Sequence, residues 1–211
     1  MKSSFAFLLI IALLAGVLSG CGAVEPGETT LPTETTEATP TPIGTLYVSF
    51  GATLEMTYDE AGNALTITGT NEIGKTLAEA KQDQLNKGCV YALRSILRYA
   101  ITENLLGDTK TVVVRIGAGD SQPTEDFLFV IGQDCQYLLD EEVSDLDMHY
   151  LTGDMLDENG DLTFDTAQML ATKYLGGEAI AAEATAPGVY TFTAGDKSCT
   201  VDAFTGQVRT Q

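Results

Sequence analysis

LYVSFGATLEMTYDEAGNALTITG, residues 46–69, is the stretch that decides the fold of the chain after its N-terminal region. Residues 46–50 form a short, mainly apolar run, and apolar and polar residues alternate along 53–58 and 64–69, which predicts three strands. Gly and Ala separate the first two strands, and residues 59–63 (DEAGN) are typical of a turn. We therefore expect an antiparallel meander.

Helical signals follow the meander. Residues 76–79 (TLAE) fit a capping box and predict a helix start, and Gly88 weakens that helix. Residues 89–105 predict a stronger helix, because five apolar residues repeat on one face: Cys89, Leu93, Ile96, Leu97 and Ala100. Residues 109–116 (TKTVVVRI) are β-branched and predict a buried strand. Residues 124–139 favour a helix, although 127–131 alone would also fit a strand.

Residues 44–141 make the first predicted module, and this module resembles the extracytoplasmic domain of RsgI-type anti-sigma factors. The residues that carry the resemblance are Tyr47-Val48-Ser49, Leu54-Glu55-Met56, Gly62 and 70–75 (TNEIGK), followed by the helix after Gly88 and the strand at Val112-Val113-Val114. The family's Asp-x-Asn-Pro between the first two strands is replaced here by Gly51-Ala52. We expect neither a cytoplasmic anti-sigma segment nor a membrane-spanning helix beside this module. The resemblance therefore implies a shared fold and not control of a sigma factor.

Residues 142–161 are acidic and are expected to be a linker, with a turn at Asn159-Gly160. The alternative is a divalent-cation site, because oxygen-rich clusters suit calcium. The acids of 140–161 do not keep EF-hand spacing, since the glycine of 157–161 (DENGD) precedes the third acidic position. We assign no metal ligand in this stretch. His149, the single histidine, is expected to be structural or exposed.

Residues 162–211 make the second predicted module. Residues 163–175 predict a helix that Gly176-Gly177 ends, and three short strand-like pieces follow at 179–184, 189–193 and 198–203. This pattern resembles a PepSY-like domain, most specifically at 201–208 (VDAFTGQV). In that motif, Asp202 and Gly206 are expected to be turn formers. The predicted fold class is α+β: two small modules, each with a helix packed on an antiparallel sheet, after a signal peptide and a disordered linker.

The N-terminal residues predict where the protein works. Lys2 precedes an apolar run from Phe5 to Leu18, which is shorter than the roughly 20 residues that a membrane-spanning helix needs. Small residues then lead to Cys21, so residues 1–20 are expected to be a secretory signal. The ending Leu-Ser-Gly-Cys resembles the lipobox of bacterial lipoproteins. The resemblance implies cleavage before Cys21 and acylation of its thiol (palmitate) and its new amino terminus.

Residues 21–43 are expected to be a tether. Within them, 25–42 (EPGETTLPTETTEATPTP) contain almost nothing apolar, so they are expected to stay disordered and to extend up to roughly 55 Å. Together with the anchor, this predicts a lipid-anchored protein on the extracytoplasmic face of the cell membrane. The tether would hold the folded modules away from the lipid surface.

Charge and cysteine content exclude several function classes. The net charge is −19, with thirty Asp and Glu against eleven Lys and Arg, which argues against nucleic acid and against a polybasic membrane contact. Cys89, Cys135 and Cys199 remain after Cys21, so at least one thiol is unpaired, and a disulfide between two of them stays open. No cysteine–histidine spacing predicts a zinc site.

The most consistent function is a non-catalytic binding or sensing module of the cell envelope. The PepSY resemblance implies a peptide or protein partner, including a peptidase that the module modulates. We predict no catalytic residues and no cofactor, because no nucleophile-elbow motif surrounds a serine and only His149 could serve as a histidine base. The alternatives are a cell-envelope hydrolase and a small-ligand receptor.

Overall fold

The computed structural model describes residues 39–143, 145–181 and 187–210. The predicted signal peptide, the predicted lipidation site Cys21 and most of the predicted tether lie outside the described residues. Within the described residues, no helix is both long enough and apolar enough to cross a membrane.

The first sheet has the strand order β3-β2-β1-β4-β5. The predicted meander is confirmed as β1 (Gly44–Ser49), β2 (Thr53–Tyr58) and β3 (Ala64–Gly69), with Tyr47 of β1 opposite Glu55 of β2. The predicted buried strand is β4 (Thr111–Ile116), which pairs antiparallel with β1. A fifth strand, β5 (Asp147–Leu151), pairs with β4 in parallel. The parallel pair is possible because a helix intervenes between the two strands.

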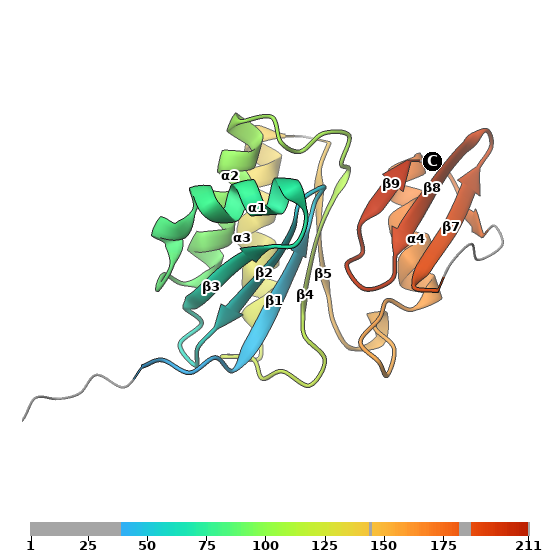
Figure 1. Ribbon diagram of the computed structural model, residues 1–211. Helices are drawn as coiled ribbons and strands as arrows, with labels where there is room; N and C mark the ends of the chain where they lie inside the picture. The colour runs from blue at the N-terminus through green and yellow to red at the C-terminus, as the bar shows by residue number, and fades with distance from the viewer. Residues whose placement is uncertain (1–38, 144, 182–186, 211) are drawn as a thin grey trace, which may run out of the picture. The chain divides into compact units, whose positions relative to one another are not determined.

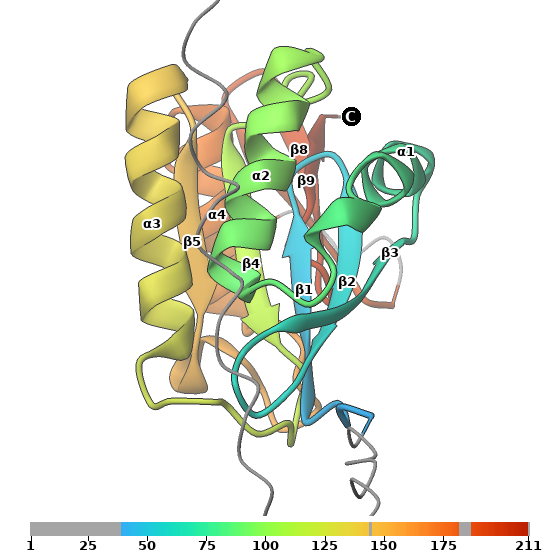
Figure 2. The same ribbon diagram turned by 90° about the vertical axis from the view of Figure 1, so that its left-hand side faces the viewer.

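Three helices cover one face of this sheet: α1 (Glu72–Ala80), α2 (Cys89–Thr102) and α3 (Phe127–Glu142) (Figures 1 and 2). Their apolar sides meet the inward side chains of the strands in one cluster of buried residues. The helix favoured for 124–139 is therefore confirmed as α3. Burial of apolar surface between the helices and the sheet is the main force that holds this layer together.

The predicted start of α1 at Thr76 is wrong, because the helix begins four residues earlier. Asn71 is its N-cap, and its Oδ1 accepts a hydrogen bond of 2.8 Å from the backbone N–H of Gly74. The same Oδ1 accepts from the N–H of Thr53 at 3.1 Å, so the cap is also held by β2. Gly88 does not interrupt a helix. It is the N-cap of α2, and a short 3-10 helix (Gln82–Gln84) lies between the two helices.

All six residues of β4 are buried, because both faces of this strand are covered. Val112 and Val114 belong to the cluster under α1, α2 and α3, whereas Val113 belongs to a second cluster with Leu151 of β5 and residues of the C-terminal part. A strand that is buried on both faces is expected to show a continuous apolar run rather than alternation. The run of valines at 112–114 fits this arrangement.

The C-terminal part is a second sheet with the strand order β6-β7-β8-β9 and one helix. The strands are β6 (Ile180–Ala181), β7 (Val189–Ala194), β8 (Lys197–Asp202) and β9 (Val208–Thr210), and all of their pairings are antiparallel. The predicted helix is confirmed as α4 (Phe164–Leu175), which packs on β7 and β8 and ends at Gly176 with a φ of 70°. The predicted α+β class is confirmed.

The expectation that residues 142–161 only link two modules is corrected at 147–151. These residues form β5, whose pairing with β4 extends from Asp147 opposite Thr111 to Leu151 opposite Arg115. A short 3-10 helix (Gly153–Met155) and a turn follow. In that turn, Asp157 Oδ1 accepts hydrogen bonds from the N–H groups of Asn159 and Asp161, so the expected turn is present.

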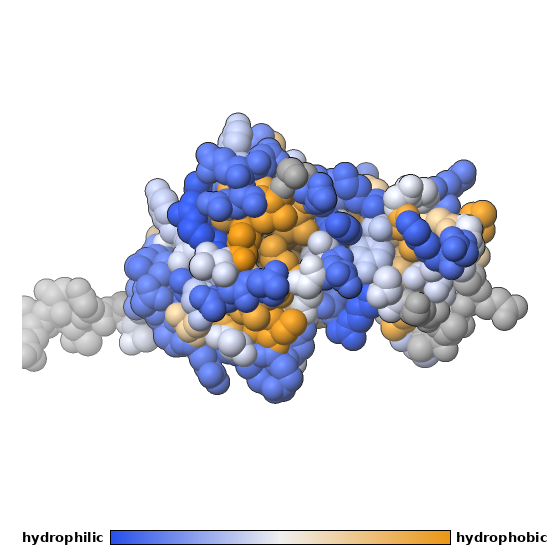
Figure 3. Space-filling view, turned by 90° about the horizontal axis from the view of Figure 1, so that it is seen from above, coloured by the Kyte–Doolittle hydropathy of each residue, from blue (hydrophilic) through white to orange (hydrophobic). Residues whose placement is uncertain are grey.

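Apolar side chains also reach the surface. Figure 3, seen from above, shows such side chains gathered on the part that holds the first sheet and its helices, with hydrophilic side chains around them. Single exposed apolar residues are normal on soluble domains. These exposed apolar side chains by themselves therefore do not define a docking surface.

Candidate functional site

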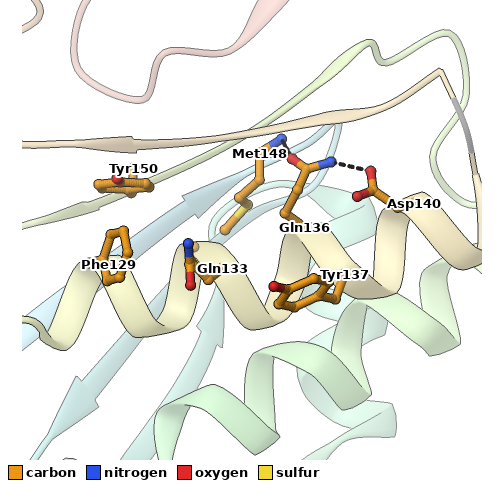
Figure 4. A pocket seen from close by; sticks show the side chains of 8 residues that line it. Phe129, Gln133, Gln136, Tyr137, Asp140, Met148 and Tyr150 are labelled. Atoms are coloured by element: carbon orange, nitrogen blue, oxygen red, sulfur yellow. Dashed lines mark hydrogen bonds between the residues drawn. The ribbon is translucent and has the colours of Figure 1, made fainter.

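A hollow of about 320 Å³ lies between helix α3 and strand β5 (Figure 4), and we call it the α3–β5 groove. Helix α3 and strand β5 line it with eight residues: Phe129, Gly132, Gln133, Gln136, Tyr137 and Asp140 from α3, and Met148 and Tyr150 from β5. The α3 residues recur every three or four positions, which places them on one side of the helix. The two β5 residues are two positions apart and share one face of the strand.

The opposite side of α3 explains why this helix lies where it does. Ile131, Cys135 and Leu138 are fully buried in the core cluster under the sheet. Their burial leaves the stripe from Phe129 to Asp140 along the outer margin of the sheet. The stripe remains accessible there, with Phe129 exposed by 45% and Tyr137 by 64%.

A glycine sets the spacing between α3 and β5 at one end of the groove. A Cβ at position 132 would lie 2.4 Å from Cδ1 of the Tyr150 ring, so any larger residue would push the ring away. The ring of Tyr150 also meets the ring of Phe129 edge to face, with centroids 6.0 Å apart. The floor of the groove at this end is therefore aromatic and closely packed.

Gln136 occupies the centre of the groove and bonds to both of its walls. Its Oε1 accepts a hydrogen bond of 2.7 Å from the backbone N–H of Met148, and its Nε2 donates to Oδ1 of Asp140 at 2.7 Å (Figure 4). The bond to Met148 is of the kind that a neighbouring strand would supply. A side-chain amide thus satisfies a backbone donor of β5.

Strand β5 stands at the end of its sheet, next to β4 alone. The N–H of Asp147 donates to the carbonyl of Lys110, which precedes β4, and the N–H of Met148 points the other way, to Gln136. Because backbone groups alternate along a strand, those of Tyr150 also point to the outer edge. Outer-edge groups of this kind are a template for another strand.

Asp140 is the only charged residue among the eight that line the groove. It lies in the last turn of α3, followed by Glu141 and Glu142. Because Glu142 Oε1 lies 3.9 Å from Nε of Arg98, part of this charge is balanced by α2. The groove is therefore aromatic at the Phe129 end and acidic at the Asp140 end.

A second hollow, of about 400 Å³, is larger than the groove but less suited to a ligand. Its charged lining residues are two lysines and two aspartates, Lys110, Lys197, Asp108 and Asp196, so their formal charges balance. Lys197 Nζ also lies 3.5 Å from the carbonyl of Leu175. We favour the α3–β5 groove, because it combines exposed aromatic rings with a strand edge.

His149 does not lie in the groove, because its side chain is on the opposite face of β5 from Met148 and Tyr150. Burial lowers the pKa of His149; Asp147 opposes this shift and Lys173 adds to it. Its Nε2 is buried and has no hydrogen-bond partner among the described residues. The described residues therefore pair no serine with His149.

The three cysteines of the described residues, Cys89, Cys135 and Cys199, are buried and free of disulfide bonds. Burial raises the pKa of Cys89 and Cys135 to about 12 and that of Cys199 to about 11. Thiols with such values are protonated at neutral pH, whereas a nucleophilic cysteine needs the thiolate. The three cysteines are therefore small apolar residues of the core.

The described residues contain no group of three or more His, Cys, Asp or Glu that could hold a metal ion. Of the acids considered for a divalent site, Asp140 lies in the groove, Asp147 pairs with Lys173 of α4, and Asp157 forms its turn. Asp202 also forms a turn, as expected: its Oδ1 accepts from the N–H groups of Phe204 and Thr205. Cys21, the one predicted site residue, lies outside the described residues.

The sequence prediction missed the groove. The pattern on α3 was visible as residues 129, 133, 136, 137 and 140, but the strand that completes the groove lay in an acidic stretch expected to be a linker. No protein-family model matches the chain, and no curated protein matches it at a significant level. The geometry of the site is therefore the basis for a functional proposal.

Proposed function

We propose that this chain is a lipid-anchored protein on the extracytoplasmic face of the cell membrane, and that it acts as a non-catalytic binding or sensing module. Acylated Cys21 holds it to the lipid, residues 21–43 are the tether, and the modules at 44–141 and 162–211 are the RsgI-like and PepSY-like parts. Its ligand is a segment of an envelope protein or a peptide. A peptidase that is modulated by the contact is one such partner.

The observation that carries the binding role is the α3–β5 groove. Tyr137 and Phe129 are exposed beside a strand edge whose backbone groups point outward. Exposed aromatic rings supply large contact area at low entropic cost, and they are enriched in interfaces. No observation of similar weight favours the hydrolase, since the described thiols are buried and His149 Nε2 has no partner among the described residues.

The anchor is tested by metabolic labelling with an alkyne-bearing palmitate, followed by membrane fractionation. The full-length chain should carry the label and sediment with membranes. The Cys21→Ala variant should lose the label, because it has no thiol at position 21 for acylation. Labelling of the variant, or unlabelled wild-type chain in the soluble fraction, would overturn the anchor.

The groove is tested by photo-crosslinking in native envelopes. A photoreactive phenylalanine analogue replaces Tyr137 in the full-length chain, and the matched control replaces Tyr91, which is 72% exposed on α2 outside the groove. We expect a discrete crosslinked product from position 137 and none from position 91. A Gly132→Leu substitution in the position-137 chain, which disturbs the groove wall, should remove the product. Equal products at both positions, or none at 137, would contradict a binding role for the groove.

A small-ligand receptor remains the alternative, because 320 Å³ is at the lower end of volumes for small-molecule pockets. The crosslinking experiment separates the two functions. A bound protein adds mass to the product at position 137 and a peptide adds less, whereas a small ligand adds only its own mass.

A further inference from the structure

We propose that the α3–β5 groove takes an extended segment that carries lysine or arginine, and that this segment binds as an added strand against β5. The inference rests on the proposed function and deepens it, because it names the binding mode and the chemistry of the partner. Three features of the groove lead to it: the strand edge, the position of Gln136 and the charge.

The edge of β5 supplies directional bonds for a sixth strand. Met148 and Tyr150 present their backbone N–H and C=O groups on the side away from β4. A segment laid along this edge would pair with both residues, which is the strand-addition mode of peptide recognition. This pairing uses backbone groups, which are the same for every amino-acid sequence. Specificity for particular side chains must therefore come from the residues that line the groove.

Gln136 already makes a hydrogen bond to β5 at the position where an added strand would make its first one. Its Oε1 accepts from the Met148 N–H at 2.7 Å, as the carbonyl of an added strand would. Rotation of this side chain would free the N–H for the segment while the amide keeps its bond to Asp140. The exchange replaces one hydrogen bond with another, so it leaves no buried donor unpaired.

The side chains of the groove match alternate residues of an extended segment. Met148 and Tyr150 face α3, and both pack against the core cluster under the helices. Alternate side chains of an added strand would point to the same side, toward Tyr137 and Phe129, while the others would point away. This arrangement favours apolar residues at every second position.

Charge decides which extended segment is suitable. Asp140 is the only charged lining residue, and the chain has a net charge of −19. The tether is a poor occupant, because residues 25–42 contain four glutamates and no lysine or arginine. A second copy of the chain is disfavoured by the same repulsion. A cationic segment is attracted instead, by Asp140 and by the net negative charge of the chain.

The test uses the full-length chain in detergent and a blocked eight-residue peptide of alternating lysine and valine. A peptide with glutamate in place of lysine is the charge control. Two further isomers carry backbone N-methyl groups either on the valines or on the lysines. In an extended peptide these two sets of N–H groups point to opposite edges, so only one isomer loses the bonds to β5.

We expect the lysine peptide to bind and the glutamate peptide to bind at least about tenfold more weakly. One N-methyl isomer should bind like the parent, and the other should lose about tenfold or more. Hydrogen exchange of the Tyr150 amide should slow in the complex. Asp140→Asn keeps an oxygen for Gln136 and should weaken the lysine peptide a few-fold without changing the fold.

Equal affinities for the two N-methyl isomers would overturn strand addition, and so would unchanged exchange at Tyr150. Failure of the lysine peptide to bind, or a preference for the glutamate peptide, would overturn the cationic partner. If the photo-crosslink at position 137 still forms in envelopes, the proposed function survives and only this binding mode fails. If the crosslink is absent as well, both fail.

Discussion

The guanidinium carbon of Arg115 lies 4.0 Å from the ring centroid of Phe204, and this contact joins β4 of the first sheet to the turn after β8. Arg115 is 2% exposed, and it also donates a hydrogen bond from Nη1 to the carbonyl of Gly160. Burial lowers the pKa of its guanidinium, while Asp161, Tyr47 and Asp202 oppose that shift. A buried cation is thus held between the first sheet and the C-terminal part.

We predict that Arg115→Ala lowers the free energy of unfolding by about 3 kcal/mol, because it removes a large buried side chain and its ring contacts. Arg115→Met should recover most of this loss, since a buried charge also has a desolvation penalty that offsets its attractions. Urea unfolding of the full-length chain measures both. A Met variant as unstable as the Ala variant would show that the charge itself, and not the packing, stabilises the joint.

The carbonyl of Gly51 accepts hydrogen bonds from Asn71 Nδ2 at 2.8 Å and from Gln207 Nε2 at 3.0 Å. We predict that Asn71→Ala lowers the free energy of unfolding by about 2 kcal/mol, through loss of the α1 cap and of the bonds to Thr53 and Gly51. Asn71→Asp keeps the acceptor for the cap and should lose about half as much. Chemical denaturation separates the two, and equal losses would mean that the cap contributes nothing.

Gly132 is predicted to be irreplaceable while Tyr150 is present. Gly→Ala inside a helix normally stabilises by about 1 kcal/mol, but here the added Cβ would meet the Tyr150 ring, so we expect a net loss of about 1–3 kcal/mol. The double variant Gly132→Ala with Tyr150→Ala should recover stability relative to Tyr150→Ala alone. If the losses in free energy of unfolding of the two single variants simply add in the double variant, the close approach of α3 to β5 is contradicted.

His149 is predicted to make stability depend on pH between 7 and 5. Burial depresses its pKa in the folded state below the ordinary value of 6.5, so the unfolded chain takes up the proton first as the pH falls. The free energy of unfolding is therefore highest above pH 6.5 and declines as the pH drops toward the folded pKa. Asp147 opposes this depression of the His149 pKa, and Lys173 adds to it.

The measurement is the free energy of unfolding at half-unit steps of pH for the wild type and for His149→Gln. The decline between pH 7 and 5 should be reduced in the variant, since glutamine does not titrate. The same decline in both chains would assign it to other groups. The lowered pKa values of Asp59 and Asp157 concern stability at lower pH, where carboxylates take up protons, so they do not interfere.

Much of the fold was predictable because its signals are local. Alternation located β2 and β3, an apolar run located β1, the apolar stripe of 89–105 located α2, and the valines of 112–114 located a buried strand. The start of α1 was missed because Asn71 is fixed partly by Thr53 and Gly51, eighteen and twenty residues away in the chain. This helix cap depends on backbone groups that are far away in the chain, so the neighbouring residues alone do not predict where the helix begins.

The sequence by itself determined the α+β class, the order of most elements and the acidic character, and it predicted the anchor at Cys21. Only the tertiary structure revealed β5 and the groove beside α3. The physical reason is that a strand edge exists only relative to its sheet: β5 (DMHYL) is a stretch of five residues inside an acidic segment, and its strand state depends on pairing with Thr111–Ile116. The spacing of Met148 and Tyr150 places them on one face of the strand, but only the tertiary structure brings that face against α3.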